Sequence, residues 1–169
     1  MDKSKLSPAK LAISGLLIGI SVLGSYISLP MPGIGSTIAF DSLPGFFGAL
    51  YLSPMLGAVI GAIGHLMTAI IHGFPQGIQS HMVVMIFMGI ACASFGFLYT
   101  KQKIVAVIVA YMFNGPVTLF LASWIAYVMS MTPTLMFLFY MLILPLSLAA
   151  LANILLAAGL YEAIGKRLR

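Results

Sequence analysis

The sequence predicts an all-α integral membrane protein, a bundle of six transmembrane helices that forms a single domain over residues 1–169. Of the 169 residues, 62% are hydrophobic and 7% are charged, whereas a soluble domain carries about 25% charged residues. Such a chain cannot cover itself with a polar surface, so we expect it to lie in lipid. The third observation is a succession of long apolar segments, because about 20 apolar residues cross the hydrocarbon core as a helix.

Six apolar segments follow one another along the chain. We expect helices over residues 8–29, 38–52, 54–71, 78–99, 104–129 and 134–164. The second is short for a full span, and Asp41 and Pro44 near its start indicate an end that is broken or sunk below the membrane surface. The Asn-Gly-Pro run that ends at Pro116 predicts a break or bend in the fifth segment, and Pro145 predicts a kink in the sixth.

The basic residues mark one side of the predicted bundle. The net charge is +5, and the basic residues are Lys3, Lys5, Lys10, Lys101, Lys103, Lys166, Arg167 and Arg169. They lie at the two ends of the chain and between the fourth and fifth segments, which is a topology signal rather than a nucleic-acid-binding surface. The connections on the other side carry no Lys or Arg. The positive-inside rule therefore predicts that both termini are cytoplasmic, as an even number of spans requires.

Asp41 is the only acidic residue between Asp2 and Glu162. An ionised carboxylate is costly to bury in hydrocarbon, so we expect it to face an internal cavity or to cap the start of a helix. The two roles are compatible, and both remain open.

The segment 72–81, HGFPQGIQSH, is the most polar uncharged stretch of the chain. If it forms a lid, then His72, Gln76, Gln79 and His81 are candidate ligand contacts; the alternative is an ordinary solvated loop. His65, in the middle of the third segment, is expected to be a hydrogen-bonded core histidine. A metal site needs three or four converging ligands, and the chain has no HExxH or CxxC motif, so we expect none.

Two aromatic and two amide side chains are further candidates. Trp124 and Tyr140 lie near the outer ends of the fifth and sixth segments. They belong either to an interfacial belt or to a surface that stacks on a flat ring. Asn114 and Asn153 lie deep in apolar segments, and we expect them to bridge helices rather than to contact a ligand.

Small residues recur at helical spacing in two segments. They are Ala12, Gly15 and Gly19 in the first and Gly57, Gly61 and Gly64 in the third. Such stripes allow close helix contacts. We expect packing within the chain for the third segment, whereas the first is open between internal packing and a partner. The chain has no P-loop and no nucleophilic serine motif, and its single cysteine, Cys92, excludes an intramolecular disulfide. We therefore expect neither an enzyme nor a cofactor in this chain.

Several of these features resemble the substrate-binding S components of energy-coupling factor (ECF) vitamin transporters. In residues 8–72 the resemblance rests on Gly15 and Gly19, four apart, and on FDSLPGFFGALYLSP leading into PMLGAVIGAIGHL. Size, six spans and apolarity are similar along the whole chain. The family commonly has Ala-x-x-x-Ala in its first helix, where this chain has glycines.

The resemblance implies a fold and a role in a prokaryotic plasma membrane. Six helices form a small bundle, and its outer loops close over one vitamin-sized molecule. A T subunit docks on the face that carries Ala12, Gly15 and Gly19, and two ATPase subunits use ATP to drive uptake.

The segments IAFDSLPGFFGAL and GHLMTAIIHGFP look most like S components for α-ribazole, a precursor of the lower ligand of cobalamin. In that case Asp41 and the 72–81 segment hold ribose hydroxyls, while Trp124 or Tyr140 stacks on the benzimidazole. Thiamine or its pyrimidine precursor remains an alternative ligand, because Asp41 could pair with a positive ring. Pantothenate is a weaker candidate ligand, because no outer Lys or Arg would balance its carboxylate. Two other classes are a stand-alone channel or carrier and an intramembrane enzyme that uses Asp41 with His65 and His72.

Overall fold

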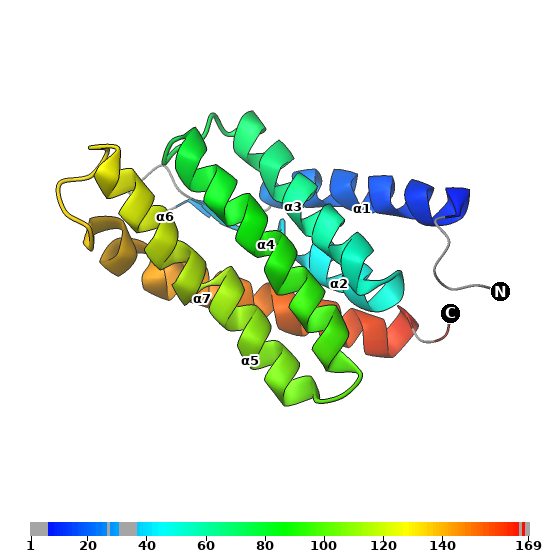
Figure 1. The fold of residues 1–169 in the computed structure, drawn as a ribbon. Helices are drawn as coiled ribbons and strands as arrows, with labels where there is room; N and C mark the ends of the chain where they lie inside the picture. Colours follow the sequence, from blue (N-terminus) through cyan, green and yellow to red (C-terminus); the bar gives the residue numbers. More distant parts are fainter. Residues whose placement is uncertain (1–6, 27, 31–36, 166, 168–169) are drawn as a thin grey trace.

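Helices make up most of the described residues, as the prediction of an all-α bundle requires (Figure 1). The computed structural model describes residues 7–26, 28–30, 37–165 and 167. Its elements are α1 (Pro8–Tyr26), β1 (Ser28–Pro30), β2 (Thr37–Ala39), α2 (Leu43–Tyr51), α3 (Pro54–Ile71), α4 (Ile78–Tyr99), α5 (Lys103–Asn114), α6 (Pro116–Val128), α7 (Phe137–Leu160) and the π-helix η1 (Tyr161–Gly165).

The third and fourth predicted helices are confirmed residue for residue, and the second is corrected. Part of the predicted helix 38–52 is the strand β2, which pairs antiparallel with β1 so that Leu29 lies opposite Ile38. The helix α2 begins only at Leu43, next to Pro44. Proline is favoured in the first turn of a helix, and in the interior of a helix it breaks the hydrogen-bond pattern, so Pro44 lies at the start of α2. At about 1.5 Å per residue α2 is too short to cross about 30 Å of hydrocarbon.

The fifth predicted helix is two helices in line. Gly115 separates α5 from α6 with φ −123° and ψ −104°, a conformation outside the helical region, and Pro116 begins the new helix. Five helices of the described chain are long and apolar enough to cross a membrane when residues 103–128 are counted as one span. The other four are α1, α3, α4 and the segment Phe137–Gly165. The sixth predicted helix is α7 followed by η1, with Pro145 inside α7.

Both termini lie at the same end of the bundle, together with the turn between α4 and α5 (Figure 1). The connections between α3 and α4 and between α6 and α7 lie at the opposite end. Lys10, Lys101, Lys103 and Arg167 therefore share the terminal end, while Lys3, Lys5, Lys166 and Arg169 are outside the described residues. That this end faces the cytoplasm stays a prediction.

The glycine face of α3 packs within the chain, as expected. A Cβ atom at Gly57 would collide with Ala49 of α2, one at Gly61 would lie 2.7 Å from Cys92 Sγ of α4, and one at Gly64 would lie 2.8 Å from Ser21 of α1. These approaches hold α3 against three neighbours at once. The main apolar core continues between α2, α4 and α7, where the rings of Phe46 and Phe95 meet edge to face at 5.5 Å.

Candidate ligand-binding cavity

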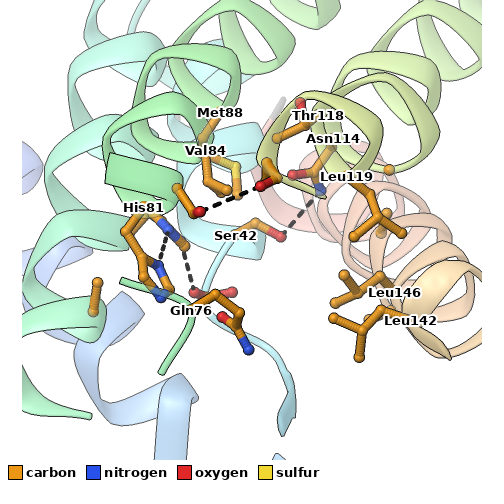
Figure 2. A pocket seen from close by; sticks show the side chains of 18 of the residues that line it. Ser42, Gln76, His81, Val84, Met88, Asn114, Thr118, Leu119, Leu142 and Leu146 are labelled. Carbon is orange, nitrogen blue, oxygen red and sulfur yellow. Dashed lines mark hydrogen bonds and ion pairs between the residues drawn. The ribbon is translucent and has the colours of Figure 1, made fainter. Parts of the chain in front are cut away.

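A cavity extends from the connection between α3 and α4 into the middle of the bundle, where α2 begins and α5 gives way to α6 (Figure 2). The centre of a water-sized sphere can occupy about 170 Å³ of it. A single water needs about 10–15 Å³ by this measure, so the cavity has room for a small organic molecule. Its walls come from α3, α4, α6 and α7 and from the residues that precede α2.

Asp41, His65 and His81 form a connected chain in one wall of the cavity. Asp41 Oδ2 lies 3.7 Å from His65 Nδ1, and the two side chains are 14% and 13% exposed. His65 Nε2 lies 3.2 Å from His81 Nδ1. The chain thus joins the segment before α2 to α3 and α4. His65 is hydrogen-bonded to His81, as expected of a core histidine, and it also lines the cavity.

Asn153 caps the helix that begins beside Asp41. Its Oδ1 accepts a hydrogen bond from the Leu43 amide at 3.1 Å, and its Nδ2 donates to the Ala149 carbonyl at 2.9 Å. Asn153 therefore satisfies an amide that has no partner within α2. Among the described residues, the partner of Asp41 is His65 rather than a backbone amide of α2. The structure thus favours the cavity role of Asp41 over the capping role.

Asn114 is the second amide expected to bridge helices, and it does so weakly. Its Nδ2 lies 3.5 Å from Ser42 Oγ, a long contact that connects the end of α5 to the start of α2 (Figure 2). Both Asn114 and Asn153 also line the cavity, a position that the sequence interpretation did not give them.

Three buried polar atoms in the cavity wall have no hydrogen-bond partner among the described residues. They are Thr68 Oγ1, His81 Nε2 and Ser123 Oγ. Leaving a buried donor or acceptor unpaired costs about 1–3 kcal/mol. Three such atoms around one cavity indicate groups that a polar ligand would satisfy.

The opposite wall comes from α6 and α7 and is largely apolar, with Thr118, Ser123 and Asn153 as its polar members. Figure 2 shows Leu119, Leu142 and Leu146 across the cavity from His81 and Gln76. Among the described lining residues Asp41 is the one carboxylate, and none is Lys or Arg. The cavity therefore has a polar wall of negative formal charge and, opposite it, a largely apolar wall. This combination suits a neutral or cationic molecule with one flat apolar side.

The structure brings together four of the seven residues predicted to contact a ligand. Asp41, His72, Gln76 and His81 line the cavity. Gln79, Trp124 and Tyr140 do not, and the last two side chains are 50% and 73% exposed. Successive helix positions are about 100° apart, so Ser123 lines the cavity while its neighbour Trp124 turns outward, and Leu138 lines it while Tyr140, two positions on, turns outward.

The sequence interpretation missed several polar residues of the cavity. Thr68 follows His65 by three positions and precedes His72 by four, so the helical period places all three on one face of α3. Ser42 follows Asp41 directly, and Ser123 precedes Trp124. The period was a usable signal for Thr68, whereas a single serine in an apolar helix more often donates to the backbone of its own helix.

The small-residue face of α1 is open. Ala12, Gly15 and Gly19 are exposed, and a Cβ atom at either glycine would meet no other atom of the described residues within 4 Å. In the isolated chain these small residues therefore do not pack against another helix. Its use by a partner stays an expectation.

Within the described residues, no three His, Cys, Asp or Glu side chains are arranged to hold a metal ion.

Comparisons with known proteins agree on one family. The family model for the substrate-specific component of ECF transporters matches residues 9–165. A solved structure of the S component of a bacterial ECF transporter has the same fold, with a TM-score of 0.65 and 16% sequence identity over 95% of this chain and 98% of that one. No curated protein matches the sequence. S components bind small ligands and partner with T and ATPase subunits in the membrane. The chain belongs to the ECF transporter substrate-specific component family.

Proposed function

We propose that this S component takes up α-ribazole into a prokaryotic cell. The observation that carries the proposal is the two-sided cavity, in which Asp41, Thr68 and His81 face the largely apolar wall of α6 and α7. α-Ribazole has the same division, because its ribose bears hydroxyls and its benzimidazole is flat and apolar. A T subunit and two ATPase subunits that use ATP would drive the transport step.

The proposed contacts differ from those that the sequence suggested. Because Trp124 and Tyr140 lie outside the cavity, the benzimidazole packs on Leu119, Leu142 and Leu146 instead of stacking on an aromatic ring. The ribose hydroxyls meet the unpaired atoms of the polar wall, with Asp41 accepting one charge-assisted hydrogen bond.

Thiamine is the second candidate, because the carboxylate of Asp41 would attract its positive ring. Pantothenate is disfavoured, since its own carboxylate would share the cavity with Asp41 and meet no Lys or Arg among the described lining residues.

Calorimetric titration of the purified protein in detergent separates these ligands. We expect α-ribazole to bind, thiamine to bind more weakly and pantothenate to give no heat of binding. Native mass spectrometry of the same sample identifies any molecule that purifies with the protein. Binding of pantothenate without binding of α-ribazole would overturn the proposal.

A further inference from the structure

We infer that Asp41 and His65 are positioning residues that hold His81 in its Nδ1–H form, so that His81 offers a ligand a hydrogen-bond acceptor. The inference rests on the proposed function only in taking the cavity as the ligand site. It deepens that proposal by naming the ligand chemistry at one atom: the ligand presents an O–H or N–H group to His81 Nε2.

The carboxylate of Asp41 determines which nitrogen of His65 carries the proton. Asp41 Oδ2 is 3.7 Å from His65 Nδ1, with both side chains largely shielded from solvent. A nitrogen lone pair that points at a carboxylate is repelled, whereas an N–H dipole is attracted. The proton of neutral His65 therefore resides on Nδ1. In a neutral imidazole the other nitrogen is then an acceptor.

The position of the proton on His65 determines the position of the proton on His81. His65 Nε2 is 3.2 Å from His81 Nδ1, and since His65 Nε2 accepts, His81 Nδ1 donates. The two ring planes are 26° apart and their centroids are 5.3 Å apart, which suits rings joined edge to edge by an N–H···N bond. Phe74 meets the His81 ring edge to face at 5.7 Å and holds it in this orientation.

The second ring nitrogen of His81, Nε2, is left to accept a hydrogen bond from a ligand. His81 Nε2 carries no proton in this arrangement, is buried and has no partner among the described residues. His81 lines the cavity, so a ligand that hydrogen-bonds to this ring has only Nε2 to use. An acceptor there selects a ligand with a donor, and the ribose hydroxyls of α-ribazole provide one.

The remaining titratable side chain in the described wall is His72. Its Nδ1 lies 2.9 Å from the Thr68 carbonyl oxygen, so it is anchored to α3 separately from the Asp41–His65–His81 chain. His72→Phe is therefore a matched control for His65→Phe: each replaces one cavity imidazole, within α3 or directly after its last residue, by a ring without nitrogen.

Long-range ¹⁵N–¹H NMR of ring-labelled histidines reads the tautomer directly. The chain has three histidines, so each ring is assigned by single substitution. The same spectra distinguish both neutral tautomers from a protonated ring, which matters because a protonated His65 would donate from both nitrogens and reverse the bond. We expect the Nδ1–H form of His81 in the wild type and in His72→Phe, and a return to the Nε2–H form, which free histidine favours, in His65→Phe.

The ligand readout compares α-ribazole with 1,5,6-trimethylbenzimidazole, which keeps the ring and lacks the hydroxyls. We expect His65→Phe to weaken α-ribazole binding about tenfold and to leave the weaker binding of the analogue unchanged. An Nε2–H form of His81 in the wild type, or an Nδ1–H form that persists in His65→Phe, would overturn the inference even if α-ribazole binds. Absence of α-ribazole binding alongside the expected tautomers would instead overturn the proposed substrate.

Discussion

Asp41 places a negative charge in the wall of a cavity that lies among membrane-spanning helices. Its partner among the described residues is the His65 imidazole, and the amide at the start of α2 is satisfied by Asn153. The carboxylate is therefore positioned for the cavity, and its energetic contribution depends on what the cavity holds. A charge-assisted hydrogen bond to a ligand contributes about 1.5–3 kcal/mol.

Asp41→Asn keeps the shape of the side chain and removes its charge. At 1.4 kcal/mol per decade, we expect the variant to bind α-ribazole about 10- to 150-fold more weakly in calorimetric titration. Its melting temperature is measured in parallel as the control for folding. Unchanged affinity together with a lowered melting temperature would show that Asp41 serves the fold rather than the ligand.

Single residues were only partly predictable from the sequence. Asp41 stands out because a carboxylate in an apolar stretch demands a partner or a cavity, and His72, Gln76 and His81 stand out because they gather in one polar segment. Trp124 and Ser123 show the limit: adjacent helix positions point in different directions. Which of them lines the cavity depends on how α6 is rotated against α7, and that rotation is set by packing partners far away in the chain.

At the scale of elements, α2 is short, and its first amide is capped from another helix. Asn153 of α7 accepts a hydrogen bond from the Leu43 amide, 110 positions away in the sequence. No local sequence pattern predicts this contact. The helices that the sequence bounded correctly, α3 and α4, have turn signals at both ends, such as Ser53, whose side chain accepts from the Leu56 amide. The start of α2 was misplaced because β2 is as apolar as the helix that follows it.

Asn153→Ala removes the cap of α2. Loss of a capping side chain costs about 0.5–2 kcal/mol, so we expect a lower melting temperature for the ligand-free protein. Ser147→Ala is the control on the same helix, because Ser147 Oγ is buried without a partner among the described residues and its removal breaks no hydrogen bond. Equal melting temperatures for the two variants would contradict the capping role.

The open face of α1 is the element that we propose for docking the T subunit. Leucine at Gly15 and Gly19 adds two bulky side chains to a face that meets nothing in the described chain. We therefore expect Gly15→Leu with Gly19→Leu to abolish uptake in cells that hold the complete transporter, while ligand binding by the isolated protein persists.

Gly159→Leu is the matched control, since Gly159 is an equally open glycine on α7, and it should leave uptake intact. Full uptake by the double variant would remove α1 from the docking surface.

At the scale of the whole molecule, the described basic residues gather at the end of the bundle that holds both termini (Figure 1). The described chain has five helices long enough to span a membrane, and the short α2 brings the chain to the end of the bundle where α3 begins (Figure 1). Charge distribution and bundle geometry agree that the two termini share a side.

We expect that side to be the cytoplasm. A reporter protein fused after Arg169 that is active only in the cytoplasm should show activity in cells. Activity confined to a reporter that works only outside the cytoplasmic membrane would reverse the orientation and place the cavity mouth inside.

The proposed binding of α-ribazole in the cavity between α3, α4, α6 and α7 is tested by a pair of adjacent substitutions. Ser123→Leu fills the cavity from α6, whereas Trp124→Leu changes an exposed side chain one position away. Calorimetric titration with α-ribazole should show at least about a tenfold loss of affinity for Ser123→Leu and wild-type affinity for Trp124→Leu. Wild-type affinity in Ser123→Leu, or loss of binding in Trp124→Leu alone, would contradict the assignment of the cavity as the binding site.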